Sequence, residues 1–236
     1  MTGLDLLRWG GQRLRVGPFR GDTKTAYVAP LPEGAPPTTD AVRRCCEVLA
    51  ERGFVEAVTA ALGPAEAHGF MTAGFEIRER LHLLAHDLLM LPEVIDIAAR
   101  RGRRGDRPGA LAVDARAFEP FWRLDDPGLE EALTATPSSR FRVVDTGSNG
   151  RIVGYAVAGR AAHRGFLQRL AVDPDQQGNG TGSALAVDAL RWMKRRGVDR
   201  AIVNTQESNE GAVRLYERLG FRLQPGGLAV LRISLT

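Results

Sequence analysis

One segment joins a strand, a glycine-rich loop and a helix without interruption, and this order most constrains the fold. Gly165–Val172 alternates as a strand does and runs into Asp173-Pro174. The loop that follows contains three glycines, and an apolar stripe then predicts a helix over Ser183–Arg196, which Gly197 ends. The stripe consists of Ala184, Leu185, Ala189, Leu190 and Met193. A strand that leads directly into a helix places this part of the chain in the α/β class.

The glycine loop has the chemistry of an anion site. Gly178, Gly180 and Gly182 remove side chains just before a helix N-terminus, so unpaired N–H groups can converge on a diphosphate. The spacing fits neither the P-loop nor the Rossmann fingerprint, because no lysine follows and the glycines alternate. Glycines also serve turns and caps, so the loop alone is a weak signal.

The surrounding segments complete an alternating pattern of strands and helices. The sequence predicts strands, helices and one hairpin turn in this order: strand 110–114, helical 118–135 interrupted at 125–128, strand 140–144, turn Thr146-Gly-Ser-Asn-Gly150, strand 151–157, strand 200–205, helix 209–219 closed by Gly220-Phe221, strand 228–235.

Two motifs in this half carry a family resemblance. Leu170-Ala-Val-Asp-Pro174 with Gln177-Gly-Asn-Gly-Thr-Gly182 resembles the coenzyme A motif of GNAT N-acetyltransferases, [RQ]-x-x-G-x-[GA]. Asn209-Glu-Gly-Ala-Val-Arg-Leu-Tyr216-Glu-Arg-Leu-Gly220-Phe221 resembles the second signature of that family, at the expected distance. The resemblance covers about residues 110–236.

The resemblance implies a role for each matching residue. The backbone of Leu170 and Val172 is expected to pair with the pantetheine arm of acetyl-CoA, and Tyr216 to protonate the leaving thiolate. Asn209 is expected to contact the cofactor arm, and a helix N-cap is an equally compatible role. For Tyr216 the alternative is a packing role. The residues expected to hold the CoA diphosphate are Gln177, Gly178, Asn179, Gly180, Thr181 and Gly182.

One position departs from the family pattern. Relatives that resemble protein N-terminal acetyltransferases carry a glutamate twelve residues before the tyrosine, where this chain has Asn204. An amide cannot act as a base. Glu207, another carboxylate, a water chain or an amine that arrives deprotonated can take its place, so the base stays unassigned.

The N-terminal half resembles a degenerate copy of the C-terminal half, and chance similarity between two αβ segments is the alternative. A shift of 144 positions aligns Val28-Ala-Pro30 with Val172-Asp-Pro174 and Gly53 with Gly197, and a further gap of two residues aligns Phe70 with Tyr216. In the aligned loop Glu33 replaces Gln177, Pro36 replaces Gly180 and Thr38 replaces Gly182, which adds negative charge and removes N–H donors. We therefore expect cofactor binding to be lost in this half.

The expected architecture is two tandem GNAT-like α/β (α+β) units, each with a mixed, largely antiparallel sheet flanked by helices. The expected domains are a degenerate unit over 1–99, an Arg/Gly linker over 100–109 and an acetyltransferase domain over 110–236. Such tandem layouts resemble proteins of the mycothiol synthase type. The implied function is transfer of an acetyl group from acetyl-CoA to a primary amine on a small molecule or a protein N-terminus. The alternative is a non-catalytic acyl-CoA-binding sensor or interaction module.

Composition and a few isolated residues bear on whether the protein is membrane-bound, secreted, RNA-binding or metal-binding. No stretch has the length of a membrane helix, and no signal peptide opens the chain, which indicates a cytoplasmic protein. The basic run Arg100–Gly109 is interpreted as a solvated linker, with an RNA-binding arm as the alternative. Adjacent Cys45 and Cys46 are interpreted as packing residues of a helix, and His82 and His86 as structural residues, so we expect no metal site.

The acceptor amine is left open by the sequence, as is the oligomeric state. Four acids, Asp125, Asp126, Glu130 and Glu131, lie in the helical segment that follows Phe121 and Trp122. Carboxylates beside aromatic rings suit a cationic amine. The alternative is a solvated helix face whose first acidic turn complements the helix dipole.

Overall fold

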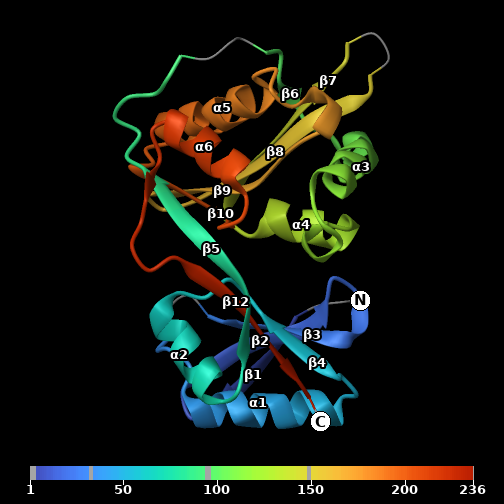
Figure 1. Ribbon diagram of the computed structural model, residues 1–236, viewed down its shortest axis with the longest axis vertical. Helices are drawn as coiled ribbons and strands as arrows, with labels where there is room; N and C mark the ends of the chain where they lie inside the picture. The colour runs from blue at the N-terminus through green and yellow to red at the C-terminus, as the bar shows by residue number, and fades with distance from the viewer. Residues whose placement is uncertain (1–3, 32–33, 94–96, 148–149, 236) are drawn as a thin grey trace. The chain divides into compact units, whose positions relative to one another are not determined.

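A computed structural model describes residues 4–31, 34–93, 97–147 and 150–235 (Figure 1). The chain forms two compact units: Met1–Leu83, Asn204–Ser208 and Gln224–Thr236 make the first, and Leu84–Val203 with Asn209–Leu223 make the second. These units do not follow the sequence-based boundaries, because residues 224–236 belong to the first unit.

The second unit is built on a mostly antiparallel sheet that contains one parallel pair. Three antiparallel strands come first, and a helix then crosses to a strand parallel to the third. The strand order is β10-β9-β8-β7-β6. The bounds are β6 (Arg100–Arg101), β7 (Ser138–Asp145), β8 (Ile152–Ala161), β9 (Arg164–Val172), α5 (Thr181–Arg195) and β10 (Arg200–Gln206).

Helices cover both faces of this sheet. α5 and α6 (Glu210–Arg218) pack on one face through Leu185, Leu190 and Tyr216, and α3 (Arg107–Ala117) and α4 (Asp126–Thr134) pack on the other through Val113 and Leu129. The central strand β8 is buried along Ile152–Gly159, as expected of a strand covered on both faces. The short helices η1 (Arg104–Asp106), η2 (Pro120–Trp122) and η3 (Pro174–Gln176) lie between these elements.

The first unit repeats the same order of elements. Three antiparallel strands are followed by a helix and a parallel strand, and a second helix comes next. The bounds are β1 (Asp5–Trp9), β2 (Gln12–Phe19), β3 (Asp22–Pro30), α1 (Thr39–Glu51), β4 (Glu56–Thr59), α2 (Pro64–Thr72) and β5 (Glu76–His86). Its core includes Leu14, Leu49 and Phe70, all fully buried. The tandem architecture predicted from the sequence is confirmed.

The last strand of each repeat leaves its own repeat. β12 (Leu228–Ser234), which comes after α6, pairs with β4 and β5 in the first unit. β5, which follows α2, ends in the second unit, where its residues Leu84 and Ala85 pair with β11 (Arg222–Leu223). Each unit is therefore completed by a strand from the other half of the sequence.

Three local predictions differ from the structure. The segment expected to be helical over 118–135 contains only η2 and α4, and α4 begins within the interruption expected at 125–128. The expected strand over 110–114 is part of helix α3, because Pro108 opens a helix in which Ala110 and Val113 share the buried face. Five apolar-rich residues cannot distinguish a strand from a helix by periodicity. The expected linker over 100–109 includes β6, η1 and the start of α3. Arg100 is fixed there by ion pairs to Asp106 and Asp145, each 2.7 Å long.

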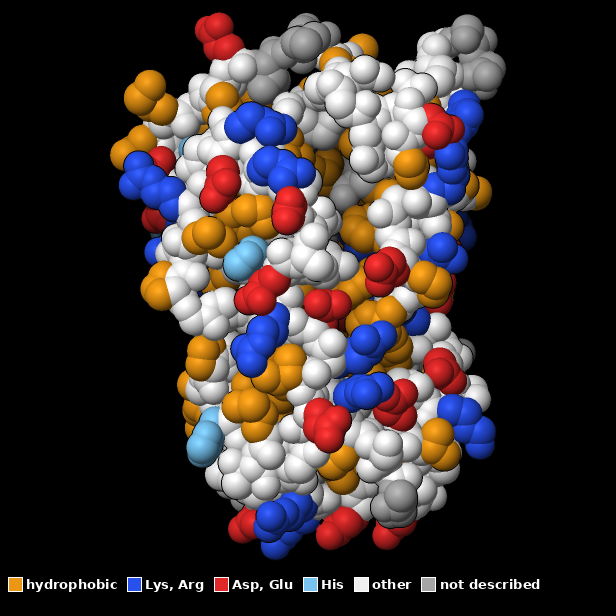
Figure 2. Space-filling view, in the orientation of Figure 1, with side chains coloured by type: hydrophobic (Ala, Val, Ile, Leu, Met, Phe, Trp, Pro, Cys, Tyr) orange, Lys and Arg blue, Asp and Glu red, His pale blue; other side chains and the backbone are white. Residues whose placement is uncertain are grey.

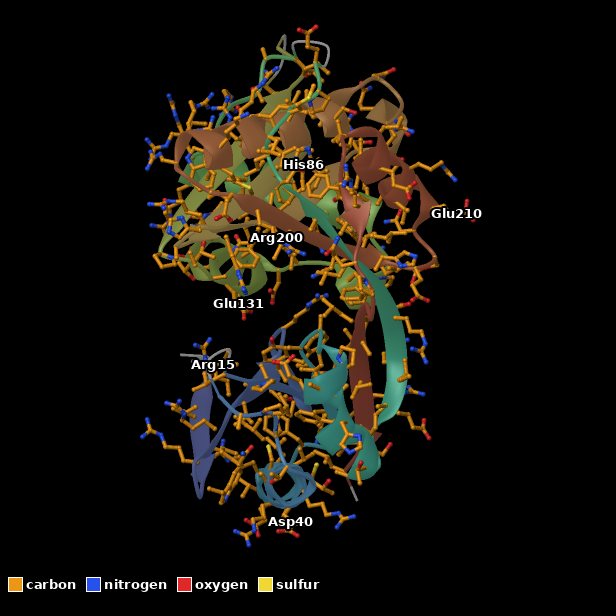
Figure 3. All side chains as sticks on the ribbon, turned by 90° about the vertical axis from the view of Figure 1, so that its left-hand side faces the viewer. Arg15, Asp40, His86, Glu131, Arg200 and Glu210 are labelled. Atoms are coloured by element: carbon orange, nitrogen blue, oxygen red, sulfur yellow. The ribbon has the colours of Figure 1, made fainter. Side chains whose placement is uncertain are left out.

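Several isolated residues have the structural roles expected of them. Burial raises the pKa of Cys45 to about 12 and that of Cys46 to about 11, so both thiols stay protonated near neutral pH. His86 is buried and its Nδ1 accepts a hydrogen bond from the Leu88 amide (Figure 3). Among the described residues no helix has both the length and the apolarity to cross a membrane. Glu33, Ser148 and Asn149 lie outside the described residues.

Candidate functional site

Among the residues that the structure describes, no strand pairs with one edge of the C-terminal part of β9. β9 and β10 pair over Arg164–Phe166 and Arg200–Ile202, and Leu167–Val172 lie beyond this ladder. On its other edge β9 pairs with β8 as far as Val172, and the Asp173 amide continues this pattern by donating to the Val153 carbonyl at 2.9 Å. Because N–H groups alternate along a strand, those of Leu170 and Val172 point to the open edge.

The loop after this edge leads into a helix N-terminus that no side chain of the described part of the chain caps. Gly178 and Gly180 have φ of +79° and +83°, which only glycine adopts readily. Gly180 is the N-cap of α5 and has no side chain to bond the first N–H groups. By contrast, Thr38, Asp125 and Asn209 cap α1, α4 and α6. The first N–H groups of a helix need partners, so the start of α5 is suited to an anion.

The other predicted loop residues differ in what their side chains do. Gln177 donates from Nε2 to the Val172 carbonyl at 3.2 Å and so ties the loop to β9. Asn179 is exposed, whereas Thr181 is buried. A Cβ at Gly182 would lie 3.4 Å from Leu215 Cδ2, so this glycine sits close against α6. Gly182 can offer only backbone groups to a ligand.

A buried carboxylate anchors the start of the loop. Asp173 is 1% exposed, and its Oδ2 accepts from Arg116 at 2.7 Å and from Arg151 at 2.6 Å. Arg116 also bonds Asp175 at 2.8 Å. Burial raises the pKa of Asp173, but the Asp175 amide and the two guanidinium groups outweigh it and lower the pKa overall. Sequence analysis missed both arginines, because 57 residues separate Arg116 from Asp173.

Tyr216 is buried in the cluster that joins α5, α6 and β9. It is 5% exposed and packs edge-on against Phe221, with ring centroids 5.5 Å apart. Leu170 and Leu215 pack against the same cluster. Burial raises the pKa of Tyr216, and the charge of Arg169 lowers it by less. The phenol therefore keeps its proton at neutral pH. Asn209 accepts from the Ala212 amide at 3.0 Å, so its N-cap role is present.

A second buried carboxylate, Asp114, binds Arg169 on the opposite face of β9. Asp114 is 0% exposed, and its Oδ2 accepts from Arg169 Nε at 2.7 Å and from the Tyr155 hydroxyl at 2.5 Å. Its Oδ1 accepts from Arg169 Nη2 at 2.8 Å and from the Leu124 amide at 2.7 Å. No sequence pattern indicated this network, which joins positions 55 residues apart.

Three of the four acids expected to face the amine have structural partners. Asp125 caps α4 by accepting from the Gly128 amide at 2.8 Å. Glu130 pairs with Arg107 at 2.5 Å, and Asp126 lies 4.0 Å from the same guanidinium group. Glu131 is exposed on α4 (Figure 3). These contacts favour the helix-face alternative for Asp125 and Glu130.

The equivalent edge in the first unit is filled. β3 pairs with β4 from Thr25 through Val28, the counterpart of Val172, and the Ala60 amide donates to the Val28 carbonyl at 2.9 Å. Thr38 caps α1 through the Ala41 amide, where α5 has no side-chain cap. The backbone features suited to acetyl-CoA therefore occur at this position in the second unit and not in the described part of the first.

In both repeats the start of one helix contacts the next helix, but the glycine and the larger residue of this contact have changed places. Gly182 lies against Leu215, whereas their counterparts are Thr38 and Gly69, and a Cβ at Gly69 would meet Pro37 and Thr38. Phe70 packs edge-on against Phe75 with centroids 5.1 Å apart, as Tyr216 does against Phe221. In each repeat one of the two residues in this contact is a glycine. Phe70, the counterpart of Tyr216, has no hydroxyl and cannot donate a proton.

No group of three or more His, Cys, Asp or Glu side chains placed to hold a metal occurs among the described residues. Asn204 lies on β10 with an exposed side chain, and no base is assigned. On the face shown in Figure 2, Lys and Arg side chains alternate with Asp and Glu side chains.

Comparison with known proteins gives consistent matches. The model of the acetyltransferase (GNAT) family matches residues 110–221. Mycothiol acetyltransferase of Salinispora arenicola is 51% identical over 153 residues, 56% of this chain and 46% of that protein. Ribosomal protein bS18-alanine N-acetyltransferase of Escherichia coli is 29% identical over 116 residues, 49% of this chain and 74% of that protein. The chain spans about half the length of the mycothiol acetyltransferases it matches.

Solved structures extend the match to the whole chain at the level of fold. A tandem GNAT protein from the clavulanic acid biosynthesis pathway has a TM-score of 0.73 at 14% identity, covering 98% of this chain and 82% of that one.

Proposed function

We propose that this chain, whose residues 110–221 match the model of the acetyltransferase (GNAT) family, transfers an acetyl group from acetyl-CoA to a primary amine on a small molecule or a protein N-terminus. One observation carries the proposal: the open edge of β9 leads through the glycine loop to the uncapped N-terminus of α5, with Tyr216 in the adjoining cluster. An edge strand offers hydrogen bonds to an extended arm, and a helix N-terminus offers them to a diphosphate.

Acetyl-CoA supplies the acetyl group as a thioester. The N–H groups at Gly178–Gly182 hold its diphosphate, and those of Leu170 and Val172 align its arm along β9. The Leu170 N–H is also placed to stabilise negative charge on the thioester oxygen. Because Gln177 already occupies the Val172 carbonyl, the arm bonds the Val172 amide and the Leu170 backbone.

The reaction forms a C–N bond and breaks the C–S bond. The attacking amine loses one proton to solvent or to a base, and the thiolate gains one from the Tyr216 hydroxyl. A phenol whose pKa is raised by burial is protonated at neutral pH, as a proton donor must be. The same rise makes it a weak acid, so its proton moves only once the sulfur carries developing charge.

The test is thiol release from acetyl-CoA with a panel of amines. The two relatives are named for mycothiol and for alanine of ribosomal protein bS18, so the panel includes a mycothiol-type amine and an alanine peptide with a free N-terminus.

With an active amine, Tyr216→Phe should lower kcat roughly a hundredfold and change acetyl-CoA affinity less than about twofold. Tyr27→Phe, in the first unit, is the matched control. Unchanged turnover in Tyr216→Phe, with chemistry rate-limiting, would assign the tyrosine to packing. Acetyl-CoA binding without thiol release across the panel would favour a non-catalytic acyl-CoA-binding module.

A further inference from the structure

β9 contains a bulge immediately before its open edge. Val157 of β8 faces Arg169 and Ala158 faces Leu167, so Gln168 is the extra residue. A bulge re-aims the side chains beside it. Gln168 lies against Gly159 and Arg169 binds Asp114, so two consecutive polar side chains point to the face covered by α3 and α4.

Arg169 holds the segment between α3 and α4 at several points. Its Nη2 donates to the Trp122 carbonyl at 2.7 Å, and its guanidinium carbon lies 3.5 Å from the centre of the Phe118 ring. Asp114, which accepts from two of the three guanidinium nitrogens, also accepts from the Leu124 amide. Residues 118–124 are thus fastened to β9 through one guanidinium group and its partner carboxylate.

The order of the proposed acetyl-CoA contacts along β9 shows which part of the cofactor Arg169 would lie beside. The inference therefore rests on the proposed function. The diphosphate loop comes after the C-terminal end of β9, so the arm runs back along the strand past Val172 to Leu170. The acyl end then lies at Leu170 or before it, level with Arg169. Burial raises the pKa of Tyr216, and the charge of Arg169 lowers it by less.

We propose that Arg169 is a positioning residue that holds Phe118–Leu124 beside the acyl end of the open edge, where this segment forms the acceptor side of the reaction centre. Arginine suits this role because its planar fork binds a carboxylate with two hydrogen bonds and stacks on an aromatic ring, which lysine cannot do.

The Arg169→Lys variant distinguishes the effect of the positive charge at this position from the effect of the guanidinium shape. The lysine keeps the positive charge opposite Asp114 and loses the paired hydrogen bonds and the stacking. We expect kcat/KM for the amine to fall roughly ten- to hundredfold, as loss of one charge-assisted hydrogen bond implies. Acetyl-CoA affinity should change less than about twofold. Amide exchange at Leu124 should become faster, because its N–H bonds Asp114.

Three variants control the experiment. Arg164→Lys, an exposed arginine on the same strand, should match the parent. Tyr155→Phe removes another bond to Asp114 and should lower stability without raising the KM for the amine. Asp114→Asn combined with Arg169→Gln leaves no buried unpaired charge, and should reproduce the amine defect if Arg169→Lys folds poorly.

The outcomes separate the two hypotheses. A parent chain that releases no thiol with any amine overturns the proposed function and this inference with it. An active parent whose Arg169→Lys variant keeps the parental kcat/KM for the amine overturns the inference alone. So does a variant in which acetyl-CoA affinity falls in parallel with amine kinetics, because Arg169 would then act on the cofactor side.

Discussion

Replacing Gly180 by proline should abolish acetyl-CoA binding. Gly180 has φ of +83° at the N-cap of α5, and proline fixes φ near −65°. The loop must therefore leave its conformation, and it also loses an N–H group that faces the proposed diphosphate. The counterpart of Gly180 in the first half is Pro36, so we expect one acetyl-CoA per chain.

The expected loss of acetyl-CoA affinity has two causes, the missing N–H donor at position 180 and the changed backbone of the loop. A hydrogen bond to a charged group is worth about 1.5–3 kcal/mol, and about 1.4 kcal/mol is a factor of ten in affinity. The missing donor alone thus predicts a loss of roughly ten- to hundredfold. Moving the neighbouring N–H groups out of alignment adds to it. Alanine keeps the donor and costs about 1–2 kcal/mol in the left-handed conformation.

Calorimetry with acetyl-CoA measures both affinity and stoichiometry. Gly197→Ala is the strain-matched control, because Gly197 has φ of +73° at the other end of the same helix. It should lower the free energy of unfolding about as much as Gly180→Ala and leave acetyl-CoA affinity unchanged. Two equivalent sites per chain, or parental affinity in Gly180→Pro, would refute the assignment of the diphosphate to this loop.

Three further predictions concern the carboxylates. Arg116→Ala should weaken acetyl-CoA affinity severalfold and leave the KM for the amine unchanged in steady-state kinetics, because Arg116 ties Asp173 and Asp175 to α3; the opposite split would contradict it. Because folding lowers the pKa of Asp173, the carboxylate stabilises the protein above the pKa of an unfolded aspartate, and this stabilisation is lost as the pH falls through the lower folded value. In urea unfolding from about pH 6 to about pH 3, Asp173→Asn should therefore lose less stability than the parent. Asp125→Asn and Glu130→Gln should each change the free energy of unfolding by about 1 kcal/mol or less, while the KM for the amine stays parental; a raised KM with unchanged stability would return these acids to the acceptor site.

Local pattern determined most of the elements in the C-terminal half. Alternation over Gly165–Val172, the alternating glycines and the apolar stripe after them each specify backbone conformation within a few residues, so β9, the loop and α5 follow from the sequence. The same holds for the Asn209 cap of α6 and for the tandem repeat, since both depend on residue types at fixed spacings. The prediction failed at 110–114, where five residues fit either period and the packing of α3 decides.

Only the tertiary structure decided which backbone groups are free. The sequence of β9 does not contain the information that its ladder with β10 stops at Phe166, because pairing is a property of two strands and of what separates them. The partners of Asp114 and Asp173 lie 55 and 57 residues away, and a charge pattern cannot say which of many arginines meets a given carboxylate. Asp125 and Glu130 had the residue type for binding an amine, yet the start of α4 and Arg107 already occupy them. Residue type fixes what a side chain can bind, and folding fixes what it meets.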